Sequence, residues 1–69
     1  MRDIEADVAL IDSASKQGAV CNISYNQPTD EHVVTLEYKD KSFATTRSNL
    51  VELIVVTTKQ LESWGFNNE

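Results

Sequence analysis

Few of the residue types that cross-link small proteins occur in this 69-residue chain. Its single cysteine excludes an internal disulfide and any zinc site built from several cysteines. A domain of this length stands near the lower limit at which a hydrophobic core is stable unaided. We therefore expect one domain, residues 1–69, stabilised by good packing or by a partner chain.

Residues suited to catalysis or cofactor binding are equally scarce. The only histidine, His32, opens a predicted strand beside a polar loop, where a solvated histidine is far more common than a lone general base. Cys21 falls in an apolar alternation, which indicates a small buried residue rather than a nucleophile. The two glycines are not clustered and form no phosphate-binding loop. We expect a non-enzymatic protein without catalytic residues, cofactor or metal.

Long apolar runs are absent, and none approaches the roughly 18 residues that a membrane-spanning helix needs. The first residues carry acids where a signal peptide has basic residues and an apolar run. We therefore expect a cytoplasmic protein that makes no membrane contact.

Basic residues are outnumbered, because six lysines and arginines face eleven acids and give a formal net charge of −5. This balance repels nucleic-acid phosphates and favours a partner protein with a basic surface. A charge of this size is also ordinary for a small soluble domain, which is the simpler explanation. The charge therefore argues against nucleic acid more strongly than it argues for any one partner.

The longest periodic segment, Leu50–Trp64, predicts the helix against which the rest of the chain packs. Asn49 is a suitable N-cap, and Gly65 stands where a left-handed residue ends a helix, so that Phe66 folds back onto Leu61. The residues that fall within one arc of roughly 100° form the core side. They are Leu50, Leu53, Ile54, Thr57, Leu61 and Trp64.

A first helix of about 14 residues is predicted, with Asp3 as its N-cap and Gly18 just beyond its end. Its core side is expected to comprise Ile4, Val8, Ile11 and Ser15, widened by Leu10 and Ala14. Its outer side carries Glu5, Asp12 and Lys16, with Asp7 near the rim. This outer side is either a solvated face, the commoner case, or an acidic strip for a basic partner.

Alternation with a period of two predicts three antiparallel strands between the helices, at residues 19–25, 32–38 and 42–46. The fold class is thus α+β, in the order αβββα, with both helices on one face of the sheet. The expected helix-facing residues are Cys21, Ile23, Tyr25, Val34, Leu36, Tyr38 and Phe43. The opposite face, open to solvent or to a partner, comprises Val20, Asn22, Ser24, Val33, Thr35, Glu37, Ser42 and Ala44.

Two valines of the last helix, Val51 and Val55, lie one turn apart and away from the core side, with Glu62 on the same side. They either pack in a seam against the first helix, which is slightly favoured, or form an apolar strip for a protein partner or a homodimer. The predicted protein-binding residues are Val51, Val55, Glu62, Glu5 and Asp12.

The strand segments Val34–Tyr38 and Ser42–Ala44, within the αβββα order, resemble the double-stranded-RNA-binding domain. That resemblance implies a nucleic-acid-binding module. The family grips RNA phosphates with lysines at the start of its last helix, where this sequence has Arg47 followed by Glu52. The resemblance therefore covers the topology and carries over no RNA-binding residue.

The segment Gln60–Trp64, in a tiny acidic α+β chain, resembles part of a phage-encoded inhibitor of a type I CRISPR complex. The resemblance to anti-CRISPR proteins implies an inhibitor of phage or mobile-element origin that occupies a basic surface of a host complex, in the cytoplasm of a bacterial cell. A protein-binding module of this kind is our leading hypothesis. A nucleic-acid-binding module is the alternative.

Overall fold

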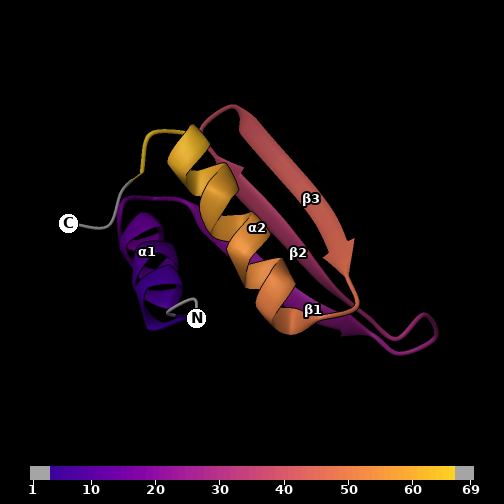
Figure 1. Cartoon of the computed structure of the whole chain (residues 1–69). Coiled ribbons are helices and arrows are strands. Elements are labelled where there is room, and N and C mark those ends of the chain that lie inside the picture. Colours follow the sequence, from indigo (N-terminus) through magenta and orange to yellow (C-terminus); the bar gives the residue numbers. More distant parts are fainter. Residues whose placement is uncertain (1–3, 67–69) are drawn as a thin grey trace.

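Two helices cover one face of a three-stranded antiparallel sheet in the computed structural model, which describes residues 4–66 (Figure 1). The elements are α1 (Ile4–Lys16), β1 (Val20–Asn26), β2 (Glu31–Tyr38), β3 (Lys41–Arg47) and α2 (Leu50–Ser63). The predicted α+β class and the order of elements are confirmed, and each strand boundary lies within about one residue of its predicted position. The predicted N-cap of the first helix, Asp3, lies outside the described residues.

The N-terminus of α2 is capped by Asn49, as predicted. The side-chain oxygen of Asn49 accepts hydrogen bonds from the backbone N–H groups of Val51 and Glu52, at 2.8 and 3.3 Å. Residues 54–58 of this helix form a run of five β-branched residues. Within this run, Thr57 and Thr58 are buried, and their hydroxyl groups donate to backbone carbonyls of the preceding turn at 2.8 Å. The run is tolerated inside the helix because these buried hydroxyls are satisfied.

Both helices end in a Schellman motif. Gly65 follows α2 and Gly18 follows α1, with φ angles of 103° and 105° that favour glycine. The next residue in each case, Phe66 or Ala19, donates its backbone N–H to a carbonyl of the last helical turn at 3.0 Å. Phe66 and Ala19 are both buried, and the Phe66 ring meets that of Tyr38 edge-on at 4.8 Å. The two chain reversals therefore close the core at the end where the helices finish.

The central strand β2 supplies the centre of the core. Leu36 lies between Cys21 of β1 and Phe43 of β3, and residues paired in this way share one face of the sheet. Val34 and Leu36 have no exposed surface. The buried apolar cluster comprises Leu10, Ala14, Ala19, Val34, Leu36, Leu53, Leu61 and Phe66.

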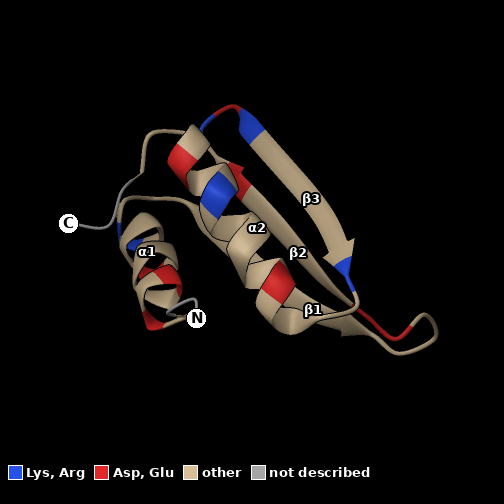
Figure 2. Ribbon diagram, viewed as in Figure 1, with Lys and Arg blue, Asp and Glu red and all other residues tan. Residues whose placement is uncertain are grey.

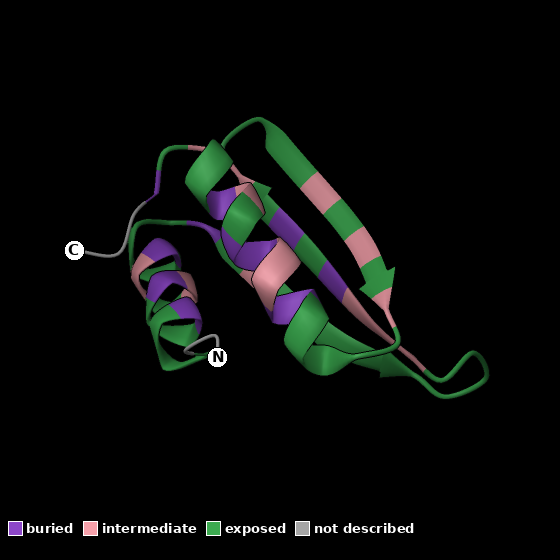
Figure 3. Cartoon of the chain, in the orientation of Figure 1, coloured by how far each residue is buried: buried purple, intermediate pink, exposed green. Residues whose placement is uncertain are grey.

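The expectation that Ile23 and Tyr25 belong to the core is wrong. Their side chains are 43% and 52% exposed, although Val34, paired with Ile23 on the same face, is 0% exposed. The reason is the placement of the helices, because α2 packs over β2 and β3, while α1 contacts β1 alone among the strands. Figure 3 shows the second half of β1 in green, as exposed. The second half of β1 points its apolar residues to the helical side without a helix above them.

The core side of α1 is rotated from its predicted position. Asp7, Leu10 and Ala14 are buried, whereas Ile4 and Val8 are 37% and 51% exposed. Small Ala14 allows a close approach to α2, so the helix turns this side inward rather than the β-branched one. Asp7, expected near the outer rim, is consequently buried.

The expected burial of four further residues also needs correction. Leu50, at the first position of α2, is 42% exposed, and Thr58 is buried in addition to the predicted core residues. Trp64 is only partly buried because it lies at the C-cap. Cys21, expected to be buried, is also of intermediate exposure because it borders the uncovered half of β1.

Candidate protein-binding surfaces

The outer side of α1 presents an apolar centre with acidic residues around it. We call this shallow depression the α1 surface, defined by Ile4, Glu5, Val8, Ala9 and Asp12. Its two larger apolar side chains are a helical turn apart and exposed by 37% and 51%. Asp12 forms an exposed ion pair with Lys16 at 3.3 Å, an interaction of little energetic weight in water. An apolar centre with an acidic rim is suited to a partner that offers aliphatic stems and basic head groups.

A second depression, the α2 surface, is defined by Arg47, Val51, Glu52, Val55 and Val56. Val51 is 50% exposed and Val55 only partly buried, so the favoured expectation that this pair forms the seam with the first helix is wrong. The buried residues that the two helices share in the core are others: Leu10, Ala14, Leu53 and Leu61.

Arg47, the basic residue of the α2 surface, forms hydrogen bonds with neighbouring residues of its own strand, β3. The Arg47 guanidinium donates to Thr45 Oγ1 and to the Thr46 carbonyl, both at 2.7 Å. Glu52 in the same depression offsets its charge. The α2 surface is therefore more nearly neutral than the α1 surface.

The five predicted binding residues thus fall into three places. Glu5 and Asp12 share the α1 surface, and Val51 and Val55 share the α2 surface. Glu62, exposed in the last turn of α2, lines neither depression. Sequence reasoning missed Ile4 and Val8, because their helical spacing fits a core side as well as an exposed one.

The face of the sheet opposite the helices is open, as predicted. Cross-strand pairing places Val20, Glu37 and Ser42 in one row and Asn22, Thr35 and Ala44 in the next. The next row holds Ser24, Val33 and Thr46, of which Val33 alone is partly buried. This face carries few charges, so a partner could cover it with little loss of charge hydration.

Charges are distributed unevenly along the molecule (Figure 2). Both helices begin at one end, where Glu5 and Glu52 lie in first turns. At the same end, the loop after β1 adds Asp30 and the first residue of β2 adds Glu31. At the opposite end lie Lys16, Lys39, Lys41 and Lys59, interspersed with acids. Acids in the first turns complement the helix dipoles, so part of this arrangement serves the fold itself.

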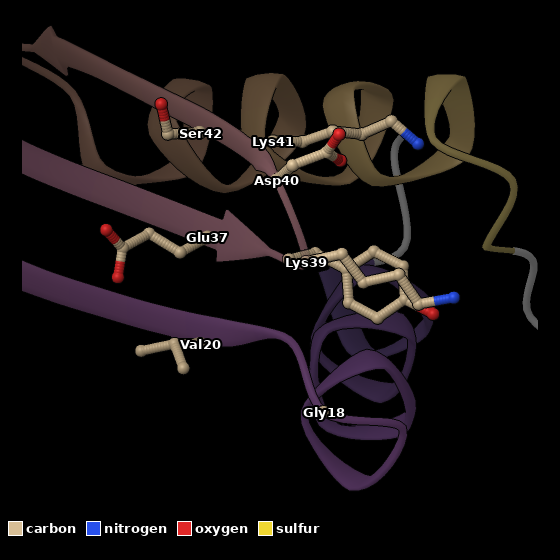
Figure 4. A pocket seen from close by; sticks show the side chains of 8 residues that line it. Gly18, Val20, Glu37, Lys39, Asp40, Lys41 and Ser42 are labelled. Atoms are coloured by element: carbon tan, nitrogen blue, oxygen red, sulfur yellow. The ribbon is translucent and has the colours of Figure 1, made fainter.

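A third depression, of about 440 Å³, lies beside the turn between β2 and β3 (Figure 4). The labelled side chains of Lys39 and Lys41 extend beyond the turn, whereas Glu37 points away from them along the sheet. The lining residues are Gly18, Val20, Glu37, Tyr38, Lys39, Asp40, Lys41 and Ser42. They include no histidine or cysteine that could activate the Ser42 hydroxyl.

Cys21, Tyr25 and His32, which have reactive side chains, are all packed against other residues of the sheet. Burial raises the pKa of the Cys21 thiol, which disfavours its thiolate. The Tyr25 hydroxyl donates to the Asp30 carboxylate, and this hydrogen bond raises the pKa of Tyr25. His32, opposite Tyr25 in the sheet, stacks its ring at 5.1 Å from the tyrosine ring in a tilted geometry. Tyr25, Asp30 and His32 together brace the base of the loop between β1 and β2.

Among residues 4–66, no group of three or more histidine, cysteine, aspartate and glutamate side chains is placed to hold a metal ion. Neither α1 nor α2 has the length and apolar character that crossing a membrane requires. Comparison of the chain with protein-family models, with curated proteins and with solved structures gave no match.

Proposed function

We propose that this protein is a non-enzymatic binding module whose α1 surface docks on a basic surface of a partner protein. The observation that carries the proposal is the exposure of Ile4 and Val8 on the same side of α1 as Glu5 and Asp12. Burying the two apolar side chains supplies a favourable free energy, and the acidic rim selects and orients a basic partner. The overall charge of −5 acts in the same direction.

Affinity purification of the tagged protein from its natural host tests this proposal. The informative variant combines Val8→Lys with Asp12→Lys, both on exposed positions of the α1 surface. The matched control combines Thr35→Lys with Glu37→Lys, which makes the same change of charge on the open sheet face. Circular dichroism establishes that both variants are folded.

The proposal predicts that the wild type and the control retain the same basic-surfaced protein, and that the α1 variant loses it. Equal capture by all three proteins would show that the α1 surface is not the binding site. Loss by the control alone would move the site to the open sheet face.

The more specific form of this proposal is a phage-encoded inhibitor that occupies a basic groove of a host complex. Its support is the similarity of Gln60–Trp64 to such an inhibitor together with the acidic charge. Co-production with a type I CRISPR complex should then restore phage plating on an immune host. Unchanged immunity would reject the proposal of a CRISPR inhibitor. The more general proposal of a binding module would still be tested by the purification experiment.

A nucleic-acid-binding module is the second candidate, because the observed αβββα order is also that of the double-stranded-RNA-binding domain. At the start of α2, however, Arg47 is engaged by Thr45 and Thr46, and Glu52 lies beside it. Phosphate contacts dominate affinity for nucleic acid, so we expect no binding of duplex RNA at physiological salt. A micromolar complex in fluorescence anisotropy would make this candidate the better one.

A further inference from the structure

The two edge strands of the sheet, β1 and β3, differ in how they are protected against pairing with a strand of another chain. β3 carries Lys41 at its first position and Arg47 at its last. β1, with the sequence VCNISYN, has no charged residue and no proline. Charged side chains and prolines are the usual means by which proteins keep an edge strand from pairing with another chain. By this criterion β3 is protected and β1 is not.

The unprotected strand also exposes apolar surface. Val20, Ile23 and Tyr25 are 47%, 43% and 52% exposed. Among residues 4–66, only β2 pairs with β1, and the outer side of β1 has no strand neighbour (Figures 1 and 4). An edge with free backbone groups and exposed apolar side chains is a template for a further strand.

We infer that β1 is a homodimer interface, in which the β1 strands of two copies pair antiparallel about a two-fold axis at Ile23. This register overlaps the whole strand, because Ile23 is its middle residue. On the helix-facing side, Ile23 meets its own copy, and Cys21 meets Tyr25 of the second copy. On the open side, Asn22 meets Ser24 and Val20 meets Asn26. On the helix-facing side, apolar residues therefore face apolar or aromatic residues, and within the paired strands no charge meets another.

The same pairing through β3 is disfavoured by charge. An antiparallel pair centred on Ala44, the middle residue of β3, sets Lys41 opposite Arg47 of the second copy at both ends. Like charges directly opposite one another destabilise a sheet. A second copy therefore fits the β1 edge and not the β3 edge.

The ends of the β1 pair add charge complementarity. Continuing the register beyond Asn26 brings the loop that contains Asp30 towards the end of α1 of the second copy. There Lys16 has a side chain that is 78% exposed. An acidic loop against a basic helix end, repeated twice by the symmetry, favours this orientation of the two copies. The β1 edge shares no residue with the α1 surface, so dimerisation stands apart from the proposed partner.

Sedimentation equilibrium over a range of concentrations tests the dimer. We expect a reversible dimer for the wild type and a monomer for Ile23→Lys, which sets two lysines against each other at the axis, with a dissociation constant raised at least about tenfold. The matched control Ala44→Lys, at the exposed centre of β3, should dimerise as the wild type does. A wild type that is monomeric at every concentration, or an Ile23→Lys variant that still dimerises, would overturn the inference.

Cross-linking tests the axis itself and does not depend on how Ile23→Lys folds. In a Cys21→Ser background, Ile23→Cys sets two thiols directly opposite one another, with Cβ atoms about 5 Å apart, near the reach of a disulfide. Mild oxidation should give a covalent dimer, whereas Ala44→Cys in the same background should form no covalent dimer. Equal cross-linking of the two variants, or none at Ile23→Cys, would contradict the proposed pairing.

Discussion

Val34 and Ile23 face each other across neighbouring strands, on the same side of the sheet, yet the first is 0% exposed and the second 43%. Both are β-branched, apolar and placed by the same alternation. They differ in what lies above and beside them, because α2 packs over β2 and β3 and does not reach β1, and because β2 is the central strand whereas β1 is an edge. Strand alternation sets the direction of a side chain, and helix placement decides whether it is buried.

The covered and uncovered halves of this side of the sheet therefore have different roles. The covered half contains Leu36 and is closed by the two glycine-terminated chain reversals that bury Ala19 and Phe66. The uncovered half leaves Ile23 and Tyr25 for other contacts. Stability should come mainly from the first half, and association from the second.

The largest effect is expected at the centre of the covered half. Leu36→Ala removes a fully buried side chain and should lower the free energy of unfolding by about 2–5 kcal/mol, a large share of the total for so small a domain. Urea unfolding followed by circular dichroism measures this loss, with exposed Thr35→Ala as the control. A Leu36→Ala variant as stable as the wild type would mean that the strand register is wrong.

A smaller effect is expected where the covered half is closed. Gly65→Ala and Gly18→Ala each place a side chain at a φ above 100°, although the added Cβ would meet no atom within 4 Å. The loss of stability is then conformational and should be about 1–2 kcal/mol for each variant. Thermal unfolding measures it. A neutral Gly65→Ala would show that the Schellman motif does not hold Phe66 in the core.

On the α2 surface the effect should be smaller still. Val51→Ser combined with Val55→Ser changes side chains that are half exposed and partly buried, so the loss should stay below about 1.5 kcal/mol. The same urea experiment applies. A loss of several kcal/mol would show that these valines form part of the helix seam after all.

The smallest effect concerns Cys21, at the boundary between the two halves. Because burial raises the pKa of its thiol, labelling by iodoacetamide at neutral pH should be slower in the folded protein than in urea. The folded state binds the thiol proton more tightly, so this contribution to stability is lost as the pH rises through the folded-state pKa. Labelling equally fast in both states would place Cys21 in solvent.

Much of the fold could be predicted because its signals are local. Asn49 as N-cap and Gly65 as C′ residue follow from backbone chemistry within a few positions, and the alternation of β2 places Val34 and Leu36 inward. The exposure of Ile23 could not be predicted in this way, since it depends on where α2 lies across the sheet. Only the tertiary structure contains that information.

The candidate sites were less predictable for the same reason. The acids Glu5 and Asp12 share an outer surface because both face away from any plausible core side of α1. The exposure of Ile4 and Val8 followed only from the rotation of the helix. Because α1 has two overlapping apolar sides, its rotation about its own axis is decided by how it packs against α2.

The most direct test of helix coverage compares Val34→Ala with Ile23→Ala in urea, at a protein concentration at which sedimentation equilibrium finds the monomer. If coverage decides burial, Val34→Ala should cost about 2 kcal/mol and Ile23→Ala about 1 kcal/mol or less, although the isoleucine truncation removes more carbon atoms. Equal losses, or a larger loss at Ile23, would contradict the account, because both strands would then lie under the helices alike.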